Sequence, residues 1–258
     1  MSNADARSFD CGAKRGARDA LRAGASRVAA VARLALPQHC ELCVARAAGA
    51  LLCAACAGEL PRVPDPCPVC ALPTPGGATC GTCLRQPPPY SATVAALAYA
   101  FPVDRLLQRI KYGGRLALAD WAGATLAAAV RAALEGRSAA LRPDRIVALP
   151  LSEARQRDRG FNQAREIAAR VAPAVAVALA APLARVSAGP PQAALPWAER
   201  RSNVRGAFTV CGDVRDARIA LIDDVMTTGA TLAEASRTLK SAGAARVECW
   251  VVARTLPR

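Results

Sequence analysis

The stretch Arg218–Leu232, RIALIDDVMTTGATL, decides the fold. Its apolar run Arg218–Ile222 leads into the acid pair Asp223-Asp224, and the loop Thr227–Thr231 then opens into a helical pattern. This order predicts a buried strand, a loop and a helix. Because free N–H groups at a helix start bind anions, and a glycine lets the backbone approach a ligand closely, the loop is predicted to hold a phosphate.

Asp223 and Asp224 need a partner other than the phosphate, because carboxylates repel an anion. Ribose hydroxyls or the hydration shell of Mg²⁺ are suitable partners. The loop lacks the Gly-Lys-Ser/Thr of a Walker A motif and the GxGxxG of a dinucleotide site. A simple helix cap without a ligand is the alternative interpretation. The run of small and hydroxylated residues between strand and helix favours the phosphate site.

Apolar runs and helical patterns alternate around this segment. Strands are expected at Ser91–Tyr99, Arg145–Leu149 and Arg246–Ala253, and helices at Pro102–Tyr112, Trp121–Leu134, Asn162–Val171 and about Thr231–Ala242. Short buried strands that alternate with helices are typical of a parallel sheet covered on both faces. The sequence therefore predicts an α/β domain.

Eight of the 11 cysteines form four Cys-x-x-Cys pairs between Cys40 and Cys83. The unit Cys-x2-Cys-x9-Cys-x2-Cys occurs twice, with first cysteines 27 residues apart. Two such pairs supply the closed four-thiolate shell of structural Zn²⁺. The expected ligands are Cys40, Cys43, Cys53, Cys56, Cys67, Cys70, Cys80 and Cys83. Two arrangements satisfy the ligand count equally well. Either consecutive pairs share a metal, or the first pair shares one with the third and the second pair shares one with the fourth.

A thioredoxin-type redox dithiol is the alternative use of such pairs, but it needs one exposed pair rather than four equally spaced ones. Cysteines in this pattern favour a reducing cytosol over a secreted disulfide framework. No run of eighteen apolar residues is present in the sequence. We therefore expect a cytoplasmic protein without membrane insertion.

The composition divides the chain into three expected parts. Residues 1–36 form a basic Ala/Arg-rich extension that is expected to be flexible, residues 37–89 the zinc module ending at Pro87-Pro88-Pro89, and residues 90–258 the α/β domain. The net charge of +14 fits nucleic acid, an anionic surface or a small polyanionic substrate. With only 3 Trp, 3 Tyr and 4 Phe, a broad base-stacking platform is disfavoured.

Four motifs in this order resemble the ComF/GntX family, in which a double zinc ribbon precedes a type I phosphoribosyltransferase domain. They are the cysteine pairs, then Leu149-Pro150-Leu151 with Arg155 and Arg159-Gly160-Phe161-Asn162-Gln163, then Gln192 with Arg200 and Asn203–Phe208, and lastly Asp223–Thr231. The resemblance covers Cys40 through Leu256. It implies a type I phosphoribosyltransferase-like parallel sheet flanked by helices.

The resemblance also implies roles toward 5-phosphoribosyl-1-diphosphate (PRPP). Asp223 and Asp224 would be catalytic and hold the ribose hydroxyls, Thr227, Thr228, Gly229, Ala230 and Thr231 would cradle the 5′-phosphate, and Pro150, Leu151 and Ser152 would receive the diphosphate with Arg155 and Arg159 beside it. The segment Gln192–Arg205, which includes Arg200, would cover the site, and Lys111 would lie in the hood above the acceptor.

Between Arg155 and Arg205, nine Arg and three acids give a local charge of +6, which suits a diphosphate leaving group. The resemblance implies an Mg²⁺-dependent phosphoribosyltransferase whose acceptor is not identified by any motif, with a link to competence and DNA uptake. The alternative is a non-catalytic PRPP sensor that binds single-stranded DNA. Competence or helicase proteins are the expected protein partners.

Overall fold

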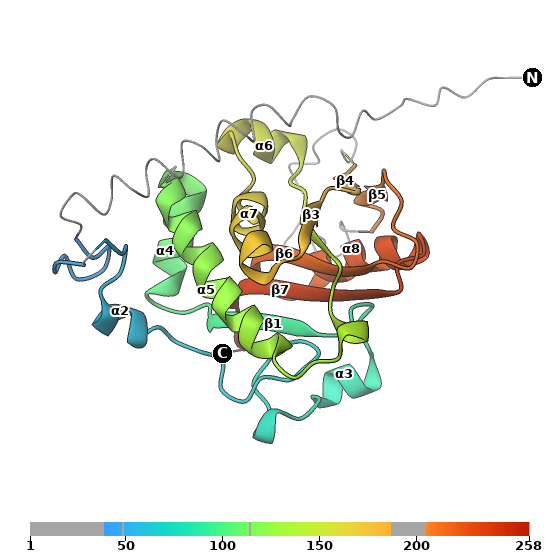
Figure 1. Ribbon diagram of the computed structural model, residues 1–258, viewed down its shortest axis with the longest axis horizontal. Coiled ribbons are helices and arrows are strands. Elements are labelled where there is room, and N and C mark those ends of the chain that lie inside the picture. Colours follow the sequence, from blue (N-terminus) through green and yellow to red (C-terminus); the bar gives the residue numbers. More distant parts are fainter. Residues whose placement is uncertain (1–38, 48, 114, 187–204, 258) are drawn as a thin grey trace, which may run out of the picture. The chain divides into compact units, whose positions relative to one another are not determined.

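The structure is a computed structural model that describes residues 39–47, 49–113, 115–186 and 205–257 (Figure 1). The chain divides into two compact units, Met1–Ala54 and Ala55–Arg258. The expected N-terminal extension 1–36 lies outside the described residues, as do Gln192 and Arg200. The second unit contains the whole sheet and the second group of cysteines.

The main sheet has five parallel strands in the order β1-β7-β6-β2-β3. Their bounds are β1 Thr93–Ala98, β2 Arg145–Ala148, β3 Ala178–Ala180, β6 Arg218–Met226 and β7 Arg246–Arg254. The strands β4 Leu183–Arg185 and β5 Phe208–Val210 form a separate antiparallel pair. A parallel sheet with flanking helices confirms the predicted fold class.

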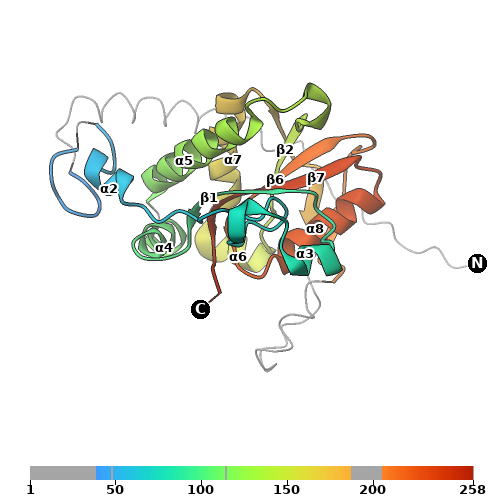
Figure 2. The same ribbon diagram turned by 90° about the horizontal axis from the view of Figure 1, so that it is seen from below.

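Helices cover both faces of this sheet (Figure 2). The helices α5 Leu116–Leu134 and α7 Gln163–Val175 pack on one face, and α8 Ala230–Ser241 packs on the other. The remaining helices are α2 Ala54–Gly58, α3 Gly81–Arg85, α4 Val103–Gly113 and α6 Glu153–Arg159, with 3-10 turns at Pro75–Gly77 and Ala139–Leu141. Because both faces are covered, β6 and β7 read as nearly continuous apolar runs.

The core on the α8 side joins Ile219 and Leu221 of β6 to Ala235 and Leu239 of α8. Alternation along β6 turns the buried Ala220 and Ile222 toward the other face. This packing fixes the direction in which β6 delivers Asp223 and Asp224 to the edge of the sheet.

Helix α5 is the one helix within the described ranges that is long and apolar enough to cross a membrane, over Ala117–Leu134. Its residues Leu118, Ala122, Leu126 and Val130 are fully buried and recur every four residues. The helix packs on α7 and on β1. These contacts are those of a core helix in an α/β domain.

Several elements differ from the sequence-based expectation. Strand β6 continues to Met226, so Asp223 and Asp224 lie inside the strand rather than after it. Helix α5 begins at Leu116 instead of Trp121. Helix α6 was not expected, because EARQRDR has no apolar periodicity; the Ser152 hydroxyl caps it by accepting from the Arg155 N–H at 3.4 Å.

The boundary between the compact units falls at Ala54, whereas the prolines suggested a division near Pro89. Residues 61–91 are tied to the sheet by backbone hydrogen bonds. Ala98 N–H donates to Pro61 O at 2.8 Å, Thr93 N–H to Pro68 O at 3.0 Å and Ser91 N–H to Val247 O at 2.8 Å. These bonds explain why the second cysteine group shares a unit with the α/β domain.

Candidate substrate site and metal centres

A cavity of about 440 Å³ opens at the carboxyl ends of β2 and β6. Ligands of open α/β sheets bind at this edge. The cavity brings together eight of the residues singled out in the sequence, namely Lys111, Pro150, Leu151, Arg155, Arg159, Asp223, Asp224 and Thr231. We call it the carboxyl-edge cavity.

The acid pair lies beside a cation in this cavity. Lys111 Nζ of α4 is 2.7 Å from Asp224 Oδ2, and the Asp224 N–H donates to Asp223 Oδ1 at 2.8 Å. Burial, followed by the charge of Asp224, raises the pKa of Asp223 well above its usual range. The two carboxylates therefore form a close, partly compensated acceptor pair, suited to hydroxyl groups or to hydrated Mg²⁺.

The loop Thr227–Thr231 turns from β6 into α8. Gly229 is the N-terminal cap of α8 with a φ of 78°, and a Cβ at this position would lie 2.8 Å from Met226 Cε and 3.1 Å from Tyr90 Oη. Thr227 and Thr228 are exposed, and Thr231 lines the cavity. The positive φ and the close contacts favour glycine at this turn, and the Ala230 N–H at the start of α8 donates to Thr228 Oγ1 at 3.4 Å.

The turn after β2 forms another side of the cavity. Pro150 and Leu151 line it directly, and Ser152 begins α6 next to them. Asn162 closes this turn, because its Nδ2 donates to Leu149 O at 3.0 Å while its Oδ1 accepts from the Arg165 N–H at 3.4 Å. The two bonds fix the start of α7 against the end of β2.

Sequence reasoning did not select two residues that line the carboxyl-edge cavity, Arg185 and Gln163. Arg185 ends the three-residue strand β4, and its guanidinium carbon lies 5.4 Å from the centre of the Phe208 ring. Gln163 is 3% exposed, and its Nε2 has no hydrogen-bond partner within the part of the chain that the structure describes. The RGFNQ motif contained a signal for Gln163, whereas the short β4 gave none for Arg185.

The eight predicted zinc ligands form two tetrads of consecutive pairs. These are Cys40, Cys43, Cys53 and Cys56, then Cys67, Cys70, Cys80 and Cys83, and within each tetrad all sulfurs lie within 4.8 Å of one another. The crossed pairing that the spacing allowed is therefore not adopted. The separations of 3.6 Å for Cys43–Cys53 and 3.7 Å for Cys70–Cys80 fit a tetrahedral Zn²⁺ site, whose edges are about 3.8 Å long at a Zn–S bond of about 2.3 Å.

One cysteine in each tetrad is predisposed to the thiolate form, whereas burial raises the pKa of Cys70 and of Cys83. Burial opposes ionisation of Cys40 and Cys67, but backbone N–H groups that donate to their sulfurs prevail. They lower the pKa of Cys40 to about 6 and that of Cys67 to about 7. The fit of both tetrads to structural zinc therefore rests on the sulfur geometry, and Cys40 and Cys67 are the cysteines most ready to bind as thiolates.

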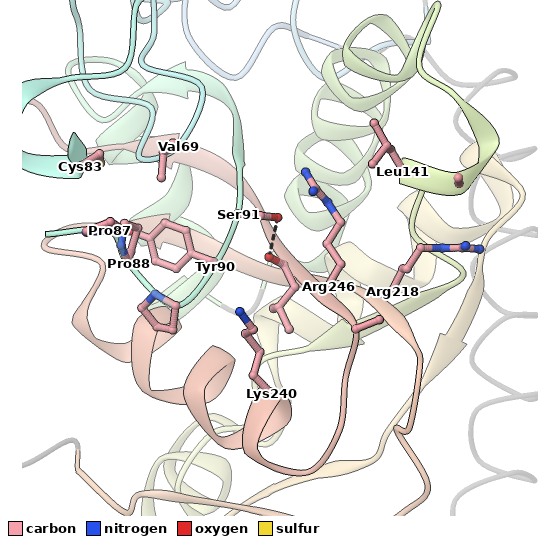
Figure 3. A pocket seen from close by; sticks show the side chains of 14 residues that line it. Val69, Cys83, Pro87, Pro88, Tyr90, Ser91, Leu141, Arg218, Lys240 and Arg246 are labelled. Atoms are coloured by element: carbon pink, nitrogen blue, oxygen red, sulfur yellow. Dashed lines mark hydrogen bonds between the residues drawn. The ribbon is translucent and has the colours of Figure 1, made fainter. Parts of the chain in front are cut away.

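A second cavity of about 510 Å³ lies at the amino ends of β6 and β7, on the edge opposite the acid pair (Figure 3). Its walls carry the cations Arg218, Lys240 and Arg246 together with the proline run and Tyr90. Arg218 pairs with Asp144 at 3.4 Å, and Arg246 lies 3.8 Å from Glu248. We call it the amino-edge cavity.

Two known domain families match two separate regions of the chain. Residues 31–84 match the double zinc ribbon domain, and residues 159–256 match the phosphoribosyl transferase domain. The DNA utilization protein YhgH of Salmonella typhi is 34% identical over 174 residues, which cover 67% of this chain and 76% of that protein. Competence protein F of Haemophilus influenzae is 32% identical over 179 residues, covering 66% and 76%.

Among solved structures, the glutamine PRPP amidotransferase of B. subtilis aligns with a TM-score of 0.35 and 20% identity, over 52% of this chain and 25% of that one. A purine phosphoribosyltransferase from Pyrococcus horikoshii aligns with a TM-score of 0.32 and 18% identity, over 63% and 77%.

Two cysteine tetrads followed by a parallel α/β domain with an acid pair before a Thr/Gly loop define a zinc-ribbon protein with a phosphoribosyltransferase-type domain. The chain belongs to the ComF/GntX family, together with the relatives named DNA utilization protein YhgH and Competence protein F.

Proposed function

We propose that the carboxyl-edge cavity binds Mg²⁺-PRPP and that the protein transfers the phosphoribosyl group to a nitrogenous acceptor. The observation that carries this proposal is the acid pair Asp223-Asp224 beside Lys111, in one cavity with Arg155 and Arg159. Carboxylates can accept hydrogen bonds from ribose hydroxyls, and guanidinium groups pair well with a diphosphate, which supports the proposal.

In the proposed reaction, the bond between ribose C1 and the diphosphate oxygen breaks with both electrons on the diphosphate. The acceptor nitrogen forms the new bond to C1 and later loses a proton to solvent. Arg155, Arg159 and Arg185 would stabilise the charge that develops on the leaving group. Bound Mg²⁺ would neutralise further diphosphate charge, with Asp223 and Asp224 holding its hydration shell.

The proposed binding roles of five further residues rest on the family resemblance and on their places in the chain near Thr231 and Leu151, which line the cavity. These residues are Thr227, Thr228, Gly229, Ala230 and Ser152. The proposed role of Arg200 and of the covering segment Gln192–Arg205 concerns residues that, apart from Arg205, lie outside the described ranges.

A diphosphate-release assay tests the transfer step. Full-length protein is incubated with PRPP and Mg²⁺, first alone and then with a panel of nitrogenous acceptors. Release that depends on both Mg²⁺ and one acceptor class is the expected result. Saturable PRPP binding without release, for any acceptor in the panel, would instead identify a PRPP sensor.

A second candidate function is binding of single-stranded DNA. It is supported by the names of the relatives and by Arg218, Lys240 and Arg246 in the amino-edge cavity. Lys240 forms no ion pair among the residues that the structure describes, so its charge is available to a phosphate. Such binding would be electrostatic, because the cavity offers one aromatic ring, that of Tyr90, for stacking.

A salt series with an oligonucleotide separates this candidate from the first. The full chain is compared with the triple variant Arg218→Gln, Lys240→Gln, Arg246→Gln, and with Arg215→Gln, an exposed cation on a turn, as the matched control. If DNA binds here, the triple variant loses affinity and its log–log salt slope becomes shallower by about two to three. Equal affinities and slopes for all three proteins would reject this cavity as the DNA site.

We further propose that the protein acts in the cytoplasm without membrane insertion, with competence or helicase proteins as partners. Support comes from the α/β fold, the thiolate metal sites and the names of the relatives.

A further inference from the structure

Arg254, the last residue of β7, carries a guanidinium group inside the domain. The residue is 4% exposed. Its Nη1 donates to Met226 O at 2.9 Å and to Thr255 O at 3.0 Å, and it also bonds Thr227 O. Its Nε donates to Cys70 O at 2.8 Å. In the portion of the chain that the structure describes, no carboxylate pairs with this guanidinium group.

A buried charge of this kind requires compensation, and Cys70, whose carbonyl accepts from Arg254, belongs to the second tetrad. A Zn²⁺ ion held by four thiolates has a net charge of 2−, the sum of +2 and −4. The sulfur geometry of Cys67, Cys70, Cys80 and Cys83 fits that ion. The negative zinc–thiolate group would therefore compensate the positive charge of Arg254, which donates a hydrogen bond to the carbonyl of the ligand Cys70.

The turn Cys67–Cys70 is held on its outer side by the α/β domain. Three consecutive carbonyls accept hydrogen bonds there. Pro68 O accepts from the Thr93 N–H at 3.0 Å, Val69 O from Thr93 Oγ1 at 2.6 Å, and Cys70 O from Arg254. On the inner side, Cys67 Sγ accepts from the Cys80 N–H at 3.3 Å. The α/β domain and the second tetrad thus both hold this turn, and a metal bound to the tetrad would hold it further.

The same guanidinium group reaches the loop Thr227–Thr231 from beneath. Met226 O and Thr227 O, which Arg254 bonds, mark the point where β6 ends and the loop begins. Tyr90, in the segment that leads from the second tetrad into β1, is buried in the same hydrophobic cluster as Met226 and Leu232, which flank the loop. Arg254 and Tyr90 therefore both connect the loop with the zinc-bearing segment.

We propose that Arg254 is a positioning residue that couples the second zinc site to the phosphate-binding loop. Zinc at Cys67–Cys83 orders the turn, the turn fixes Arg254, and Arg254 holds the backbone of Met226 and Thr227 in the conformation that binds an anion. The role toward PRPP rests on the proposed function, whereas the coupling itself does not.

Hydrogen exchange of the zinc-loaded full chain, without PRPP, measures the coupling directly. We compare wild type with Arg254→Gln, Arg254→Lys and the exposed control Arg215→Gln. Exchange at 67–70 and 226–231 is expected to rise about tenfold or more in Arg254→Gln, the factor that corresponds to one lost charge-assisted hydrogen bond. Arg254→Lys keeps the charge but has one nitrogen, so it raises exchange in at least one of these segments. Exchange in α5 and in Arg215→Gln stays at the wild-type level.

The converse arm removes the metal instead of the arginine. Cys83→Ser takes a ligand from the second tetrad, and Cys43→Ser is the matched control in the first tetrad, which Arg254 does not hydrogen-bond. Zinc content confirms the loss in each variant. Exchange at 226–231 is expected to rise in Cys83→Ser and to stay near wild type in Cys43→Ser.

The proposal would be overturned if exchange at 226–231 stayed at the wild-type rate in both Arg254 variants. The same rate in a Cys83→Ser protein that has lost its zinc would also overturn it. If Arg254→Gln does not fold, Arg254→Lys and Cys83→Ser still decide. Affinity for PRPP and Mg²⁺, measured on the same samples, separates the two claims. Coupling without PRPP binding would reject the proposed ligand alone, and PRPP binding without coupling would reject the role of Arg254 alone.

Discussion

At the scale of single residues, the ionised Asp223 is expected to favour ligand binding and to lower the stability of the fold. Burial and the adjacent Asp224 raise its pKa, so the carboxylate is less favoured in the folded state than in the unfolded state. Its contribution to stability is fully present below the unfolded pKa and is lost as the pH rises through the raised folded pKa. At neutral pH, this carboxylate therefore lowers the stability of the fold.

We accordingly expect Asp223→Asn to raise Tm at pH 7 by about 2–4 °C, the shift that about 1 kcal/mol produces in a domain of this size. The same variant should lose PRPP affinity, because the neutral amide is a weaker acceptor for ribose hydroxyls. Thermal unfolding at pH 5 and pH 8 checks the sign, with a larger gain at pH 8. A lower Tm than wild type at both pH values would contradict this account of Asp223.

Lys111 compensates the acid pair from another element. Its Nζ is 2.7 Å from Asp224 Oδ2, and the two side chains are 22% and 13% exposed. Lys111→Met should lower the unfolding free energy by about 1–3 kcal/mol, because it leaves a half-buried carboxylate pair without its cation. Lys240→Met, which removes an exposed lysine without an ion pair in the described part of the chain, should change it by less than about 0.5 kcal/mol. Denaturant unfolding of both variants tests this difference, and equal losses would contradict it.

At the scale of elements, the turn from β6 into α8 depends on one glycine. Gly229→Ala adds a Cβ that would lie 2.8 Å from Met226 Cε, at a φ of 78°. Gly136→Ala is the matched control, because Gly136 has a φ of 70° with no atom within 4 Å of its Cβ position. Both variants lose the conformational freedom of glycine, and only Gly229→Ala should shift the loop.

Gly229→Ala is therefore expected to cost about 1–3 kcal/mol more than Gly136→Ala in denaturant unfolding, and to reduce PRPP affinity, which the control retains. Similar stabilities and affinities for the two variants would show that Met226 and Tyr90 give way without moving the loop.

The elements that the sequence predicted well are those buried on both faces. The apolar runs at β6 and β7 are nearly continuous because helices cover both faces of the sheet. The acid pair of β6 and the Thr/Gly loop after it then allowed one side of the site to be predicted. Helix α6 and the strands β3 and β4 were not predicted, since a helix with six polar or charged residues out of seven and strands of three residues carry no periodicity. Arg185 was missed for that reason, although it lines the cavity.

At the scale of the whole molecule, the cysteine spacing predicted the ligands of both tetrads, and the fold added which pairs share a metal. The unit boundary at Ala54 could not be predicted, because it depends on tertiary bonds such as Thr93 Oγ1 to Val69 O at 2.6 Å, which leave no local signal.

The two tetrads predict a zinc content of two per chain. Cys67→Ser should reduce it to one, and a strong chelator should remove both ions and lower Tm, because metal binding to preformed thiolate sites is linked to folding. Atomic emission of the purified protein, followed by thermal unfolding with and without chelator, measures both effects. A content of one in wild type, or an unchanged Tm after complete removal, would contradict the assignment of two structural sites.

The central claim, that the carboxyl-edge cavity binds Mg²⁺-PRPP, is tested most directly by titration calorimetry of the full chain. The account predicts saturable binding at one site, dependent on Mg²⁺ and abolished in Asp223→Ala plus Asp224→Ala. Glu135→Ala plus Asp213→Ala, which removes two exposed carboxylates elsewhere, should retain wild-type affinity. Absence of binding in wild type, or equal affinity in the Asp223→Ala plus Asp224→Ala variant, would contradict the account.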